Sequence, residues 1–162
     1  MDLWNTADIA IAAGFFALGI GRIGCLLVGD DYGLEAPASL PFPLAFRVPD
    51  PIPDRAQWAP TPPGTWVYAT QIYLSANGFF LAGLGRWLLS RRKFAGQVVW
   101  TTTAVYCVTR SIIEHFRGDD AARGMVVPGA LSTSQAISIP LFLLSLFMLL
   151  RLSRRRKVPA RR

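Results

Sequence analysis

Four long apolar segments, separated by polar stretches, dominate the chain. They cover residues 8–28, 66–89, 97–116 and 134–152. Each is close to the roughly 20 residues that a helix needs to cross the apolar core of a bilayer. The pattern predicts an all-α, polytopic membrane protein with about four transmembrane helices, in which residues 1–152 form a single transmembrane domain.

The stretch at 30–65, between the first two segments, holds nine of the twelve prolines in the chain. Such a density of proline excludes a long helix. The stretch also carries Phe42, Phe46 and Trp58. Two interpretations stay open: a lid or interfacial arm that lies on lipid headgroups, or a connector without fixed structure.

The placement of basic residues predicts an orientation. The net charge is +7, and the cations gather between the second and third segments and in a basic tail at 153–162. The positive-inside rule then places both termini in the cytoplasm and the 30–65 stretch on the exoplasmic side. We interpret the tail as a topology signal that attracts anionic lipids, and we expect no nucleic-acid partner.

The two cysteines, Cys25 and Cys107, both lie inside apolar segments. The sequence contains no CxxC motif and no Cys/His cluster, so we expect no disulfide, no metal site and no cofactor. Cys25 belongs to a series of small residues spaced by four, which predicts the face on which the first helix packs closely against another. The series consists of Ala13, Ala17, Gly21, Cys25 and Gly29.

An arginine, Arg22, interrupts the first apolar segment. Arginine at the centre of a transmembrane helix costs roughly 2.5–3.5 kcal/mol on insertion scales, unless an anion or an interface meets it. One interpretation is a functional site that faces protein, water or headgroups. The other is a helix-end anchor whose side chain reaches lipid phosphates.

A polar face runs along the end of the third segment. Tyr106, Arg110, Glu114 and Arg117 follow one another at spacings of four, four and three residues, which places them on one side of a helix. Arg110 and Glu114 can form an ion pair. Two interpretations stay open: the ion pair only joins helices inside the bundle, or the face is a cationic site that holds a phosphate. In the second, Tyr106 and Glu114 can orient a proton or relay it.

Together with Arg22, the two arginines of this face predict an anion site. The predicted topology places Arg22, Arg110 and Arg117 at similar depth in the outer half of the membrane. Arginine binds phosphate with two parallel hydrogen bonds, and the anion at that depth is a phospholipid headgroup. Such a clamp stabilises a departing phosphate as charge develops, and glycines such as Gly24 let the backbone approach.

These motifs resemble the prolipoprotein diacylglyceryl transferase family. The family signature, approximately Arg-Ile-Gly-Asn-Phe-x-x-Gly-Glu-x-Tyr-Gly, is similar to the sequence from Arg22 to Gly33, with Cys25 at the Asn position and Asp30 at the Glu position. The later pattern Tyr-x-x-x-Arg-x-x-x-Glu-x-x-Arg matches the polar face of the third segment. Weaker likenesses involve Gln71, Tyr73, Gln135, Ser138 and Pro140.

The resemblance implies transfer of diacylglyceryl from phosphatidylglycerol to the lipobox cysteine thiol of a prolipoprotein signal peptide, as a step of lipoprotein biosynthesis in a bacterial plasma membrane. The substrate thiol is the nucleophile, and the site faces the exoplasmic side. The headgroup-binding residues we expect are Arg22, Gly24, Gln71, Arg110 and Arg117. The catalytic residues we expect are Tyr106, Arg110 and Glu114.

Other functions stay open from the sequence. The family carries about three further transmembrane segments and a His-Gly-Gly motif before the segment that resembles 8–28. Three alternatives follow for the chain. It is an enzyme by itself, a phospholipid-binding protein without turnover, or the C-terminal half of a split enzyme with a three-segment partner. A small transporter or channel subunit is a further alternative, and self-association through small residues is compatible with each.

Overall fold

The computed structural model describes residues 3–52, 61–117, 125–127 and 131–154. Over these residues the protein is mostly helical, with two small antiparallel sheets. The helices are α1 (Leu3–Val28), α2 (Thr70–Arg91), α3 (Gln97–Glu114) and α5 (Thr133–Ser153). The strands are β1 (Ala45–Arg47), β2 (Trp66–Tyr68), β3 (Met125–Val127) and β4 (Leu131–Ser132), paired β1 with β2 and β3 with β4.

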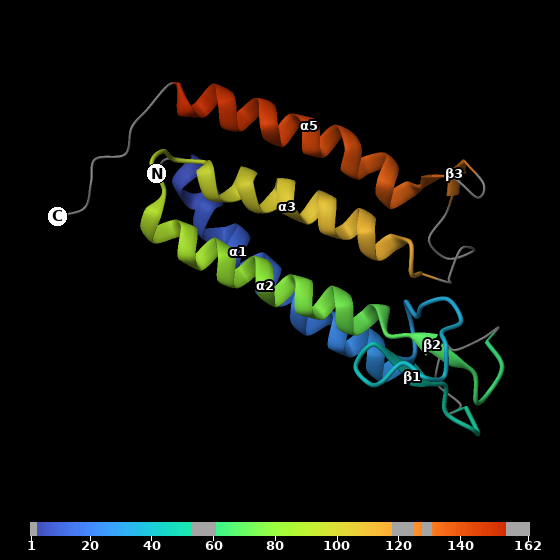
Figure 1. Ribbon diagram of the computed structural model, residues 1–162. Coiled ribbons are helices and arrows are strands. Elements are labelled where there is room, and N and C mark those ends of the chain that lie inside the picture. Colours follow the sequence, from blue (N-terminus) through green and yellow to red (C-terminus); the bar gives the residue numbers. More distant parts are fainter. Residues whose placement is uncertain (1–2, 53–60, 118–124, 128–130, 155–162) are drawn as a thin grey trace.

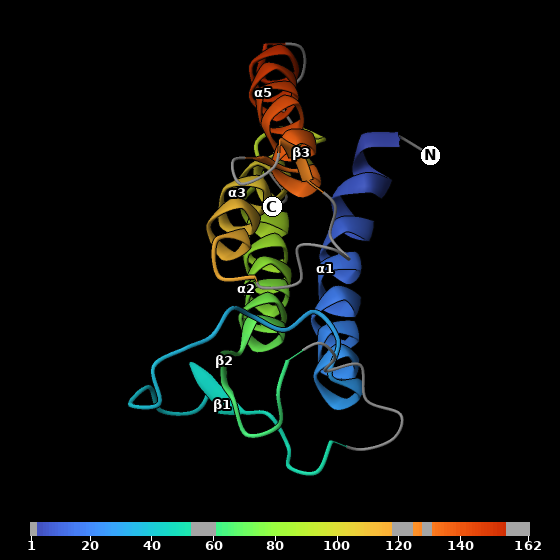
Figure 2. The same ribbon diagram turned by 90° about the vertical axis from the view of Figure 1, so that its right-hand side faces the viewer.

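The helices lie alongside one another with the loop layer at one end (Figures 1 and 2). α1 packs mainly against α2, and α5 packs mainly against α3, while α2 and α3 join the two pairs. The start of α1, the turn from α2 to α3 and the end of α5 share the end of the bundle opposite β1 and β2 (Figure 1).

Each apolar segment of the sequence contains one of these helices, although the predicted limits differ. α1 begins five residues before the predicted 8–28 segment. The start of the predicted 66–89 segment was wrong, because Trp66–Tyr68 forms β2 and α2 begins only at Thr70. Among the described helices, α1 and α5 are long and apolar enough to cross a membrane by length and composition.

Close contact between α1 and α2 depends on facing glycines. A Cβ on Gly78 would lie 2.7 Å from the Gly19 nitrogen and 3.0 Å from the Phe15 carbonyl oxygen. The predicted packing face of α1 is not the face that contacts α2, because Ala13, Ala17 and Gly21 are exposed. A strict spacing of four drifts around a helix by about 40° per step, and the actual contact face alternates spacings of three and four, at Asp8, Ala12, Phe15, Gly19 and Arg22.

A buried aspartate closes the end of the bundle where α1 begins. Asp8 is fully buried, and its carboxylate lies 2.7 Å from the Arg92 guanidinium in the turn between α2 and α3. The same carboxylate accepts hydrogen bonds from the Gly96 and Val99 N–H groups, both at 2.9 Å. These N–H groups belong to the N-terminus of α3, where a negative charge is favourable. The Asp8 carboxylate therefore joins α1 to the start of α3.

At the opposite end the proline-rich stretch is folded where the structure describes it. β1 pairs with β2 in the register Ala45 to Tyr68. Tyr32, Val48 and Val67 form a small buried apolar cluster beneath this ribbon. The interpretation of the stretch as a connector without fixed structure was therefore wrong for residues 30–52 and 61–65, whereas Trp58 lies outside the described residues.

The α1–α2 contact gives a matched pair of glycine substitutions. Gly78→Ala should lower the stability by about 2 kcal/mol, because its methyl group meets the backbone of α1 and the helices must separate. Gly83→Ala, in the same helix, has no atom within 4 Å of its new Cβ. It should leave stability unchanged or raise it slightly. Thermal midpoints in detergent measure both, and equal midpoints would contradict this packing.

Candidate functional site

The segment that follows α1 connects the ends of three helices. α1 ends at Val28, and the next residue, Gly29, has the left-handed conformation, while the Asp30 N–H donates to the Cys25 carbonyl at 3.0 Å. The chain then passes between β2 and the end of α3. The Gly33 N–H donates to the Tyr68 carbonyl at 3.1 Å, and the Leu34 N–H donates to the Phe116 carbonyl at 2.8 Å. This backbone insertion places Asp30 and Asp31 beside the end of α3.

Asp31 bridges two arginines from different parts of the chain. One carboxylate oxygen pairs with Arg22 of α1, and the other pairs with Arg117, just after α3. Burial alone would raise the pKa of the Asp31 carboxyl, but the adjacent Arg117 and Arg22 guanidiniums outweigh it and hold the pKa below its usual range. The Asp31 side chain is 19% exposed and Arg117 is 4% exposed, so the bridge is largely shielded from solvent.

Arg110 has a separate carboxylate partner. Its Nη2 lies 2.9 Å from Oε2 of Glu114, as the spacing of four in one helix predicts, and it donates to the Ser134 hydroxyl of α5 at 3.0 Å. Arg110 is 8% exposed, and its Nη1 has no hydrogen-bond partner among the described residues. Arg22 and Arg117 are close enough for their charges to act on its guanidinium. The structure therefore joins Arg22 and Arg117 through Asp31 and leaves Arg110 within electrostatic reach of both.

Two side chains in the first turn of α2 bind the backbone carbonyls of Asp30 and Asp31. The Thr70 hydroxyl donates to the Asp31 carbonyl at 2.6 Å, and the Gln71 amide donates to the Asp30 carbonyl at 2.8 Å. Both side chains are fully buried. Gln71 Oε1 has no partner among the described residues, and a buried acceptor without a donor is costly. Gln71 thus lies in the predicted site with one polar atom still available.

Next to this network, a cavity of about 290 Å³ lies between α1 and α2. Arg22 and Gln71 supply its charged and strongly polar lining, and the other walls are mainly apolar, with Ile23, Leu26, Ile72, Ser75, Ala76 and Phe79. A cavity that is cationic at one end and apolar elsewhere suits an amphiphile with an anionic headgroup. A second cavity, of about 340 Å³, lies between α3 and α5 beside Cys107 and His115.

Two predicted site residues, Tyr106 and Gly24, take no part in the ion pairs, although Tyr106 lies within electrostatic reach of Arg110. The Tyr106 ring contacts the Phe15 ring of α1, with centroids 5.5 Å apart, one helical turn before Arg110. Gly24 is exposed on α1, and a Cβ there would meet no atom within 4 Å. His115 is exposed, and its Nδ1 lies 2.9 Å from the Ser111 carbonyl.

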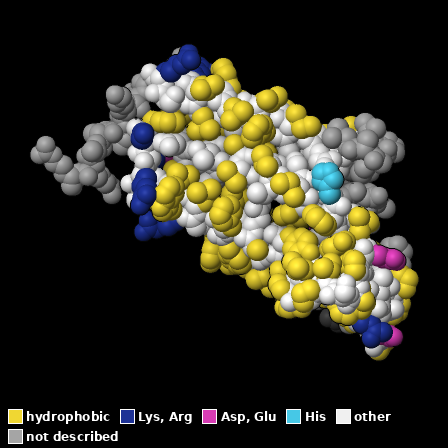
Figure 3. Space-filling model, viewed as in Figure 1, with side chains coloured by type: hydrophobic (Ala, Val, Ile, Leu, Met, Phe, Trp, Pro, Cys, Tyr) yellow, Lys and Arg dark blue, Asp and Glu magenta, His cyan; other side chains and the backbone are white. Residues whose placement is uncertain are grey.

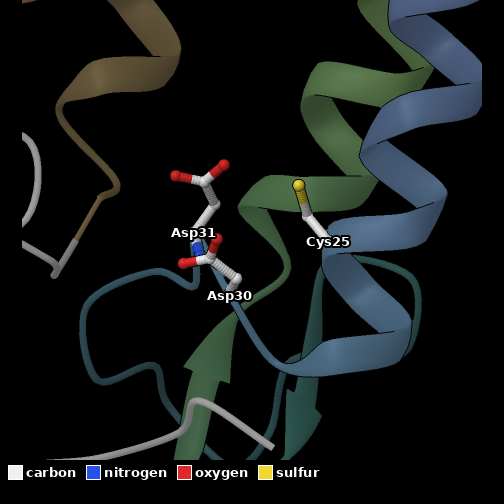
Figure 4. A group of neighbouring side chains, drawn as sticks. All are labelled: Cys25, Asp30 and Asp31. Atoms are coloured by element: carbon white, nitrogen blue, oxygen red, sulfur yellow. The ribbon is translucent and has the colours of Figure 1, made fainter.

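Cys25, Asp30 and Asp31 lie together at the end of α1 (Figure 4). One potential metal-ligand atom from each lies within 4.8 Å of the others. Both oxygens of Asp31, however, pair with arginines, and Arg22 Nη1 is 3.8 Å from the Cys25 sulfur. Two guanidinium groups at the carboxylate oppose a cation, so the arrangement fits an anion better than a metal ion.

Sequence reasoning missed three members of the network, which are Asp31, Thr70 and Ser134. Asp31 had one usable signal, because an acidic doublet directly after an arginine-bearing apolar segment offers that arginine a partner. Thr70 and Ser134 had none, since their contacts with Asp31 and Arg110 join residues 39 and 24 positions apart. Only the packing of α1, α2, α3 and α5 brings such residues together.

Comparison with known proteins agrees with this arrangement of motifs. A sequence profile of the prolipoprotein diacylglyceryl transferase family matches residues 1–151. The chain belongs to this family. It is 33% identical over 147 residues, or 91% of the chain, to the phosphatidylglycerol–prolipoprotein diacylglyceryl transferase of Clostridium tetani. The enzyme of the same name from Geobacter sulfurreducens is 33% identical over 160 residues, or 94% of the chain.

A second clostridial relative has a similar match. Phosphatidylglycerol–prolipoprotein diacylglyceryl transferase 2 of Clostridium perfringens is 35% identical over 141 residues, covering 84% of the chain and 48% of its own length. The Clostridium tetani and Geobacter sulfurreducens proteins are each covered over 53% of their length. The chain thus spans about half the length of the curated relatives it matches.

The lowered pKa of Asp31 predicts an acid-sensitive stability. A carboxyl with a lower pKa in the folded state stabilises the protein above its ordinary pKa of about 3.9, and the contribution is lost as the pH falls through the lowered value. Asp31→Asn should lower stability by about 2 kcal/mol at pH 7 and by less at pH 3. Thermal midpoints between pH 7 and pH 3 test this, with Asp50→Asn, an exposed loop residue, as control. Parallel curves for wild type and Asp31→Asn would refute it.

Proposed function

We propose that the protein acts in bacterial lipoprotein biosynthesis, moving diacylglyceryl from phosphatidylglycerol to the lipobox cysteine thiol of a prolipoprotein. The names of its relatives motivate the choice of substrates. The observation that carries the proposal is the pairing of Arg22 and Arg117 on Asp31, with Arg110 within reach of their charges, at one end of an apolar helix bundle. Guanidinium groups shielded from water bind a phosphodiester strongly.

In the proposed reaction, the thiol sulfur attacks the carbon of the diacylglyceryl group that bears the phosphate oxygen. A C–S bond forms, the C–O bond breaks, and glycerol phosphate leaves with the electron pair. The arginines stabilise the charge that develops on the phosphate oxygens. Glu114 orients Arg110 through the 2.9 Å ion pair. Its carboxylate takes up the thiol proton, either directly or by relay through the Tyr106 hydroxyl. Gln71 Oε1 and the backbone near Gly24 complete the headgroup site.

We propose four membrane-crossing helices in one domain, residues 1–152, with both termini and the 153–162 tail in the cytoplasm. Basic residues gather where α2 and α5 end (Figure 3), and they include Arg91, Arg92, Lys93, Arg151 and Arg154. Exposed apolar side chains cover the helices between this end and the loop layer. The positive-inside rule then directs the arginine site to the exoplasmic face.

Cysteine labelling tests this orientation. In a Cys25→Ser, Cys107→Ser background, Ser39→Cys in the loop layer should react with a membrane-impermeant maleimide added to intact cells. Lys93→Cys, in the turn between α2 and α3, should react only after the membrane is permeabilised. Both native residues are exposed, so labelling reports sidedness rather than burial. The opposite pattern would reverse the proposed topology.

The reaction is tested by lipidation of a lipobox peptide in vesicles that contain phosphatidylglycerol. Arg110→Ala should lower the transfer rate by about 10²-fold or more, because a preorganised phosphate contact is lost. Arg110→Lys, which keeps the charge opposite Glu114, should fold normally and still transfer slowly, because lysine lacks the bidentate geometry. Arg86→Ala, an exposed arginine of α2, should retain the wild-type rate.

Three outcomes separate the proposals. Absence of transfer by the wild-type chain, in vesicles where a full-length relative is active, would overturn catalysis by the chain alone. Retained binding of phosphatidylglycerol without transfer would then identify a lipid-binding protein without turnover. Transfer that appears only on addition of a three-segment partner would identify one half of a split enzyme.

A further inference from the structure

The two arginines that border the proposed phosphate site already have an anionic partner. Asp31 places one carboxylate oxygen on Arg22 and the other on Arg117. Carboxylate and phosphate bind guanidinium groups with the same paired-oxygen geometry. A phosphate that binds both arginines therefore competes with Asp31 for the same N–H groups.

The position of Asp31 is set by its backbone. Its φ of 58° lies in the left-handed region, which non-glycine residues adopt uncommonly and aspartate tolerates better than most. Its carbonyl accepts the Thr70 hydroxyl at 2.6 Å, and its N–H donates to the Asp30 carboxylate at 2.8 Å. Contacts on both sides of the residue hold the carboxylate between the two arginines.

Arg110 differs from the other two arginines. Its Nη1 is buried without a hydrogen-bond partner among the described residues, although its Nη2 pairs with Glu114. An incoming phosphate therefore meets one unpaired guanidinium nitrogen, Nη1, at Arg110 and two guanidinium groups that already pair with Asp31. Full engagement of the three arginines requires Asp31 to leave at least one of them.

We propose that Asp31 is an internal counter-ion that the phosphate of the ligand displaces, and that it thereby sets the affinity and selectivity of the site. The inference rests on the proposed phospholipid site. A ligand binds by exchange, because it must replace the charge-assisted contacts of Asp31 with contacts of its own. An amphiphile without an anionic oxygen cannot compensate the arginines and is rejected.

The inference predicts that removal of the Asp31 charge tightens binding. The full chain in detergent is titrated with dihexanoyl phosphatidylglycerol, and separately with glycerol phosphate, to distinguish a lipid headgroup from a free phosphate. Asp31→Asn should lower the dissociation constant of the lipid by roughly tenfold, since hydrogen bonds to charged groups are among the stronger ones. Its binding should also weaken more steeply with added salt, because the site is then more positive.

Matched variants separate competition from support of the fold. Asp31→Glu keeps the charge and should bind no more tightly than wild type, and Asp50→Asn should match wild type. Asp31→Ser removes the charge by a second route, so that misfolding of one variant does not decide the result. The thermal midpoint of each variant is measured beside the titration.

The results for Asp31 and for the site itself can be told apart. If wild type binds the lipid and both charge-removing variants fold yet bind it equally or more weakly, Asp31 positions the arginines and the inference is overturned. If wild type binds the lipid no better than Arg110→Ala does, the proposed phosphate site is overturned as well. Tighter binding of glycerol phosphate than of the lipid would assign the site to a free phosphate, with Asp31 still the group displaced.

Discussion

The two ion pairs of Asp31 hold together helix ends that are far apart in the sequence. Through Arg22 and Arg117, one carboxylate joins the last turns of α1 to the end of α3. The backbone insertion of residues 30–35, the start of α2 and the position of Arg110 all lie around this bridge. Without a carboxylate here, two arginines shielded from water would repel each other, which would weaken the contact between the ends of α1 and α3.

Aspartates occupy both ends of the bundle, with different consequences. Asp8 is completely buried, and its contacts are an arginine and two N–H groups at the start of α3, so nothing outside the protein can reach it. Asp31 retains an exposed fraction of 19% and borders a cavity-lining arginine. The first aspartate therefore holds the fold, whereas the second holds the fold and controls what the arginines can bind.

Features that depend on one helix were predictable from the sequence. The helices follow from the length of their apolar segments, and the pair of Arg110 with Glu114 follows from a spacing of four in one helix. Predictions that required a partner element failed. The small residues spaced by four on α1 do not mark its contact face with α2, because Gly78 of α2 packs against Gly19 instead. Trp66–Tyr68 is apolar enough to extend α2, yet pairing with β1 makes it a strand.

By itself, the sequence determined where the four long helices of the described residues lie, the distribution of charge and the order of family motifs, since these are properties of local composition and spacing. It also identified Arg22 as a costly residue that needs an anion, and Arg22, Arg110 and Arg117 as parts of one anion site. Only the tertiary structure decided which anion each arginine meets. That choice depends on approaches between residues such as Asp31 and Arg117, separated by 86 positions, and the packing of helices with glycine contacts determines them rather than any pattern along the chain.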